Sequence, residues 1–180
     1  MNAPTAPNLP WGLHRLTAAM NALGTLWILA LTLLIVADVI GRNLFAAPLP
    51  GVPETAALSI VGIVFLQLAD TLRCGGFTRA DVLLTRWQQQ HPAWHAAALA
   101  LWYALGALLL AIVAGASAPL LVESVRIGEY VGAVGSFQAP LWPVRLVTLA
   151  GLAVTALTYL LLMGTELHRL HALRRQAVAS

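Results

Sequence analysis

Four long apolar stretches, at about residues 16–40, 54–72, 93–119 and 143–164, constrain this chain more than any other feature. A helix needs about 20 apolar residues to cross a hydrocarbon core of ~30 Å, so each stretch can span a bilayer. The composition agrees: charged residues make up 9% of the sequence, against about 25% in soluble domains. We therefore predict an all-α integral membrane protein with four transmembrane helices, forming a single membrane domain over residues 1–180.

The segment between the second and third stretches predicts a further, shorter helix. Over residues 79–90, Val82, Leu83 and Trp87 could share one helix face, with Arg79 and Arg86 turned toward water. A helix with one apolar face and one charged face lies in the interface between lipid and water. We expect a short interfacial amphipathic helix there.

The arginines predict the orientation of the chain in the membrane. The sequence has no lysine, and four spans would place seven of its ten arginines on the side of the two termini: Arg15, Arg73, Arg79, Arg86, Arg169, Arg174 and Arg175. Cytoplasmic loops carry the excess of positive charge, so we expect both termini in the cytoplasm. Because the arginines interrupt apolar runs, with no cluster on a solvated face, we expect membrane lipid around the chain and no nucleic-acid partner.

Charged residues lie toward the ends of the spans. Asp38 and Arg42 are four residues apart, the spacing of a helical ion pair. Glu54 follows a helix-starting proline and could reach the same arginine across the short loop. A proton or ion relay would need acidic groups deeper in the membrane, so we favour a clasp that orients two helix ends. Gln67, inside the second span, predicts a hydrogen bond between helices.

Small residues form two stripes at helical spacing. The third span has Ala96, Ala100, Ala104, Ala107, Ala111, Gly115 and Ala118, and the fourth has Thr148, Gly151, Thr155 and Thr158. Such stripes let another helix approach closely. Packing within this chain is the favoured interpretation of both stripes, and a surface for a partner is the alternative.

Nothing in the sequence predicts catalysis, a metal site or a cofactor. His91 and His95 can share a helix face, as can His168 and His171, but no span has a histidine in its interior, where haem ligands of a cytochrome b-like bundle would lie. The chain has no GxSxG nucleophile motif and no P-loop. The single cysteine, Cys74, excludes an internal disulfide and a site with several thiolate ligands.

The segment from Arg42 to Asp81 resembles the small membrane subunit of TRAP transporters, the tripartite ATP-independent periplasmic transporters (a DctQ-like subunit). That family shows an arginine after the first span, a PLP-like loop, a glutamate opening the second span and a GGHIRVD-like turn. The matching residues are Arg42, Pro48-Leu49-Pro50, Glu54 and Gly75-Gly76-Phe77-Thr78-Arg79-Ala80-Asp81, and the later Pro140, Trp142 and Pro143 resemble the entry into the last span. Gly51 and Phe77 depart from the pattern, which usually has tryptophan and histidine there.

The resemblance implies an accessory subunit in the bacterial inner membrane, with no enzymatic activity. In such transporters a periplasmic binding protein delivers an organic acid to a permease whose large subunit holds the substrate and sodium sites and moves as an elevator. The small subunit supports it as a scaffold and has no substrate, metal or cofactor site. The resemblance points to Arg42, Glu54, Arg79 and Asp81 as structural or interface positions, to which the clasp adds Asp38.

Two functions of other kinds stay open at the level of sequence. A membrane anchor of a redox complex would need haem ligands inside the spans. A stand-alone four-helix exporter would need an acidic residue deep in a span, and Asp38 is a weak candidate for that.

Overall fold

The computed structural model describes residues 10–74, 92–132 and 137–179. In this part of the chain, four helices are long and apolar enough to cross a membrane, which confirms the predicted fold class. They are α1 (Trp11–Phe45), α2 (Val52–Arg73), α4 (Pro92–Ile127) and α5 (Trp142–Ala179), with two short strands, β1 (Tyr130–Val131) and β2 (Ala139–Pro140), before α5. The predicted interfacial helix at 79–90 lies outside the described residues.

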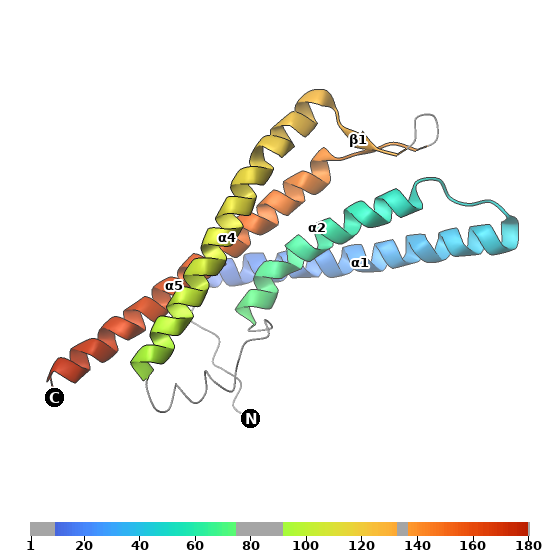
Figure 1. Cartoon of the computed structure of the whole chain (residues 1–180). Helices are drawn as coiled ribbons and strands as arrows, with labels where there is room; N and C mark the ends of the chain where they lie inside the picture. The colour runs from blue at the N-terminus through green and yellow to red at the C-terminus, as the bar shows by residue number, and fades with distance from the viewer. Residues whose placement is uncertain (1–9, 75–91, 133–136, 180) are drawn as a thin grey trace.

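The helices form two hairpins with a common loop end and a common terminal end. The loop end holds residues 46–51, between α1 and α2, and the described residues 128–132 and 137–141, between α4 and α5; the terminal end holds the start of α1 and the end of α5. At the loop end, β1 and β2 pair antiparallel with Tyr130 opposite Pro140. The α1–α2 hairpin and the α4–α5 hairpin splay apart toward this end (Figure 1).

The helix boundaries follow from local chemistry. Helix α2 begins after Gly51, whose left-handed backbone (φ 79°) turns the chain, and Pro53 occupies the first turn, where its missing N–H costs nothing. Helix α4 continues through Pro119 to Ile127, beyond the predicted end of the third span. A proline inside a helix removes one backbone hydrogen bond, and here the helix does not end there.

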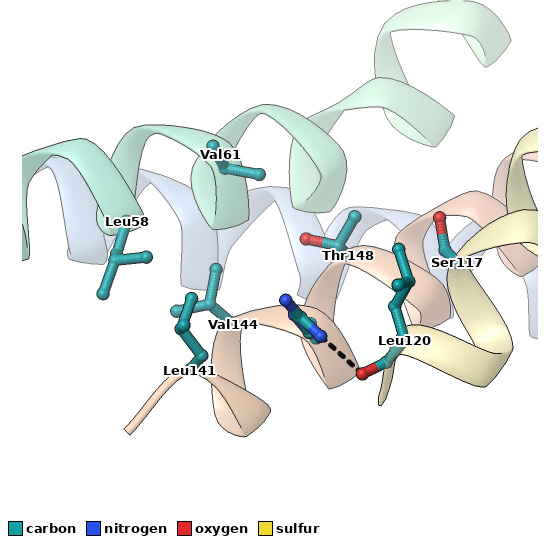
Figure 2. A pocket seen from close by; sticks show the side chains of 8 residues that line it. Leu58, Val61, Ser117, Leu120, Leu141, Val144 and Thr148 are labelled. Carbon is teal, nitrogen blue, oxygen red and sulfur yellow. Dashed lines mark hydrogen bonds between the residues drawn. The ribbon is translucent and has the colours of Figure 1, made fainter. Parts of the chain in front are cut away.

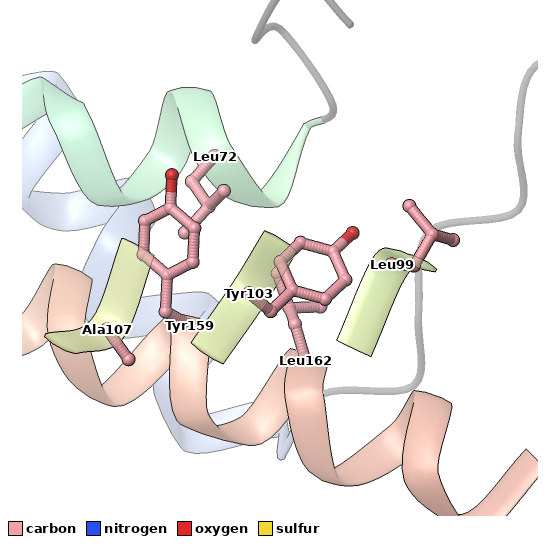
Figure 3. Close-up of a cluster of buried hydrophobic side chains, with 6 residues drawn as sticks. All are labelled: Leu72, Leu99, Tyr103, Ala107, Tyr159 and Leu162. Carbon is pink, nitrogen blue, oxygen red and sulfur yellow. The ribbon is translucent and has the colours of Figure 1, made fainter. Parts of the chain in front are cut away.

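The main contacts between helices follow the order α1–α2–α5–α4. The core lies toward the terminal end, where Leu72 of α2 packs with α4 and α5 (Figure 3). There the rings of Tyr103 and Tyr159 meet edge to face with centroids 6.1 Å apart. Many large apolar side chains of α1 and α4 remain exposed in the chain, as expected for helices surrounded by lipid or by other subunits.

Close helix packing depends on the small residues of α5. Gly151, Thr155 and Thr158 are buried, and a Cβ at Gly151 would lie 2.7 Å from the carbonyl carbon of Phe65 on α2. Three of the four stripe residues of the fourth span therefore pack within the chain, whereas Thr148 is half-buried. Only part of the third-span stripe is packed within the chain. Ala96, Ala100 and Ala107 are buried, whereas Gly115 has no atom within 4 Å of a Cβ built on it.

Candidate functional site

The carboxylate of Asp38 ties the end of α1 to the loop that follows it. Its Oδ2 accepts a hydrogen bond from Arg42 Nε at 2.8 Å, and its Oδ1 accepts one from the backbone N–H of Leu49 at 2.8 Å. Asp38 is 6% exposed, whereas the Arg42 side chain is about half exposed. The helix itself ends at Phe45; the next residue, Ala46, has a left-handed backbone, and the N–H of Ala47 donates to the carbonyl of Gly41. The Asp38 carboxylate thus neutralises the charge of Arg42 and also anchors the loop that follows α1.

Glu54 is not part of this arrangement. No ion pair among the described residues joins it to Arg42; the partner of Arg42 is Asp38. Glu54 lies in the first turn of α2 and is half-buried, and its Oε2 is inaccessible to solvent and has no hydrogen-bond partner. Arg79 and Asp81 lie outside the described residues. The functional roles of all five positions remain predictions.

Three hydrogen bonds between side chains connect α1 to α2. Gln67 donates to Thr25 Oγ1 at 3.4 Å, and Trp27 Nε1 donates to Ser59 Oγ at 3.1 Å. Near the terminal end, Asn21 donates to Asp70 Oδ2 at 2.9 Å. The prediction that Gln67 bonds between helices is therefore confirmed. In each of these bonds a polar side chain of one helix is paired with a polar side chain of the other, which stabilises helix association in hydrocarbon.

Glycines bring the same two helices close enough for these bonds. A Cβ at Gly24 would lie 2.8 Å from Cγ of Gln67, and one at Gly62 would lie 3.1 Å from the Trp27 ring. The two polar side chains therefore lie directly over backbone on the opposite helix. A larger residue at either glycine would displace a hydrogen-bonding side chain.

A second ion pair, between Arg73 and Asp70, lies at the terminal end of α2. Arg73 donates to Asp70 Oδ1 from Nη2 at 2.7 Å and from Nε at 3.0 Å, and both side chains are largely buried. Asp70 also accepts the bond from Asn21, which the sequence reasoning missed. Thr17, Asn21 and Thr25 recur every four residues in an otherwise apolar span, and this polar face was the signal that could have revealed the pairing.

At the loop end, Arg145 joins α4, α5 and the segment between them. Its guanidinium donates to the backbone carbonyl of Leu120 on α4 and forms an ion pair with Glu129 at 3.0 Å. Phe137, in the same segment, lies over Gly51: a Cβ at Gly51 would collide with the Phe137 ring. Although the helices of the two hairpins splay apart, their loop ends therefore remain in contact through this ring. The sequence reasoning assigned no partner to Arg145.

An apolar cleft of about 230 Å³ opens between α2, α4 and α5 toward the loop end. Figure 2 shows its lining: Leu58 and Val61 of α2 stand opposite Val144 and Thr148 of α5, with Ser117 and Leu120 on α4. Leu141 and Arg145 complete the lining. The described part of the chain offers no cluster of polar groups inside this cleft that could bind a solute.

The described histidines lie toward the terminal end. His95 is buried near the start of α4 with its Nδ1 unpartnered, and His168 and His171 are exposed on α5. His91 lies outside the described residues. No group of three or more histidine, cysteine, aspartate or glutamate residues in the described part could hold a metal ion.

Comparison with known protein families decides the assignment. The model of one family, the tripartite ATP-independent periplasmic transporters, DctQ component, matches residues 31–168, most of the chain. The chain belongs to this family. Searches of curated proteins and of solved structures return no match.

Membership confirms the resemblance recognised in the sequence. A DctQ component is part of a transporter and not an enzyme, and this one is a multi-pass protein of the inner membrane. The family also implies association with the other TRAP components, the large permease subunit and the binding protein. The matched region begins within α1 and ends within α5, so it contains the clasp and the cleft. It also contains the α2 partners of the α1–α2 bonds, whose α1 partners lie before residue 31.

Proposed function

We propose that this DctQ component is a static scaffold that supports the large, elevator-type permease subunit of a sodium-coupled TRAP transporter for organic acids, and that it holds no substrate site. The observation that carries the proposal is the pairing of polar groups within the spans. Gln67, Asn21 and Trp27 bond to the neighbouring helix, and Asp38 bonds to Arg42. A carrier needs polar groups that converge on a site near the midplane and are free to bind a solute.

The close contacts between helices support a rigid body. Gly24, Gly62 and Gly151 each face a side chain or backbone group of another helix at a distance that a Cβ would not tolerate comfortably. Helices packed at this distance cannot slide past one another without breaking the bonds between them. Such a subunit suits the fixed part of a transporter, against which a mobile domain moves.

Orientation is part of the proposal. The terminal end would face the cytoplasm, because that side carries seven of the ten arginines. The loop end, with the clasp and the cleft, would then face the periplasm, where the binding protein docks.

Reconstitution tests the function. Liposomes containing this chain alone should show no sodium-driven uptake of an organic acid, whereas liposomes that also contain the large subunit and the loaded binding protein should show it. The sodium gradient is reversed as a control, which should abolish uptake. Robust uptake by the chain alone would refute the scaffold role and favour a stand-alone transporter.

A further inference from the structure

An acidic residue lies close to the cleft, on the loop-end side of it. Glu54, Leu58 and Val61 follow one another at steps of four and three residues, which places them on one face of α2. Leu58 and Val61 line the cleft (Figure 2). Glu54 therefore lies on the same helix face, one turn nearer the loop end.

Two charged residues near the cleft, Arg145 and Glu54, differ in whether they have partners. Arg145 lines the cleft, but its guanidinium is already bonded to Glu129 and to the carbonyl of Leu120. Among the described residues Glu54 has no ion-pair partner, and its Oε2 is inaccessible to solvent and has no hydrogen-bond partner. A carboxylate withdrawn from water without a partner is costly, and a cation beside it removes that cost. The cleft therefore favours an occupant that brings a positive charge to Glu54, and it disfavours an anionic lipid headgroup at that position.

The body of the cleft favours an apolar occupant. Its volume of about 230 Å³ exceeds the ~150 Å³ of an apolar cavity that takes up benzene. The hydroxyl group of Ser117, in the cleft lining, already donates a hydrogen bond to the carbonyl of Val113. An aromatic ring or a pair of branched aliphatic side chains would fill this space and pack against its mostly leucine and valine lining.

We propose that a transmembrane segment of the large permease subunit docks in this cleft. Its apolar side chains pack between α2, α4 and α5, and a lysine or arginine at its periplasmic end pairs with Glu54. One membrane-embedded segment supplies both requirements, an apolar body and a cation at the end where the carboxylate lies. The inference rests on the proposed function and adds the surface and the charge through which the two subunits meet.

Photo-crosslinking in membranes tests the surface. The photoreactive residue p-benzoylphenylalanine replaces Val61 in the cleft or, as a control, Leu33, which is 62% exposed on α1. The control shows that the photochemistry works and measures nonspecific crosslinking. The residue at position 61 should form a covalent adduct with the large subunit. Adducts at position 61 with lipid alone, with a second copy of this chain, or with nothing would overturn the proposal.

Substitution of Glu54 tests the charge. Glu54→Gln should lower the amount of large subunit that co-purifies with this chain by about tenfold, less than for a wholly buried charge pair because Glu54 keeps part of its surface exposed. The matched control is Glu123→Gln, since Glu123 is an acid near the same end, half-exposed and paired with Arg126; it should change co-purification less than twofold. Equal effects of the two substitutions would refute the pairing. If the wild-type subunits do not co-purify at all, the proposed function itself fails.

Discussion

Replacing Gly151 by alanine should force α2 and α5 apart. The new Cβ would lie 2.7 Å from the carbonyl carbon and 3.0 Å from the Cβ of Phe65, inside the 3.4 Å at which ordinary contacts begin. The obstacle includes backbone, so a side-chain rotation cannot relieve the contact, and one of the two helices must shift.

The magnitude follows from two opposing effects. Overpacking costs about 1–3 kcal/mol, and the rigid obstacle places Gly151→Ala toward the upper limit. Alanine also favours the helix by about 1 kcal/mol relative to glycine. We therefore expect a net destabilisation of about 2 kcal/mol, which corresponds to a fall in Tm of roughly 4–8 °C for a chain of this size.

Thermal unfolding of the purified protein in detergent, followed by tryptophan fluorescence, measures this effect. The matched control is Gly164→Ala on the same helix, because no atom lies within 4 Å of a Cβ at that position. The control should leave Tm unchanged or raise it slightly. If Gly151→Ala is as stable as Gly164→Ala, α2 and α5 are not packed backbone to backbone as described.

Two further predictions concern orientation and the clasp. In a variant with Cys74 replaced by serine, a single cysteine at position 50 should react with a membrane-impermeant maleimide in intact cells, and a single cysteine at position 76 should not. The reason is that the arginines favour a cytoplasmic terminal end. The reverse labelling pattern would contradict the orientation. Arg42→Ala should leave Asp38 buried with only the Leu49 N–H as a partner, and should lower the yield of assembled complex while transport per assembled complex stays normal. A changed substrate profile with normal assembly would instead place Arg42 near a substrate site.

The sequence by itself determined the four spans, the ion pair of Asp38 with Arg42 and the bond of Gln67 between helices. Each of these follows from local information. Hydropathy over a stretch of about 20 residues identifies a span, a spacing of four residues sets a helical pair, and a lone amide in an apolar span must find a partner. The order of motifs from Arg42 to Asp81 also sufficed to recognise the family.

Only the tertiary structure decided which helix lies beside which, and therefore which polar groups are paired. The sequence could not show that Glu54 Oε2 lacks a hydrogen-bond partner in the described part of the chain, that Arg145 pairs with Glu129, or that Phe137 covers Gly51. A hydrophobic pattern specifies that a helix face is apolar, but lipid and a neighbouring helix are equally apolar surroundings, so the pattern does not distinguish them. The cleft beside Glu54 exists because two hairpins splay apart, and that angle depends on contacts between residues far apart in the chain.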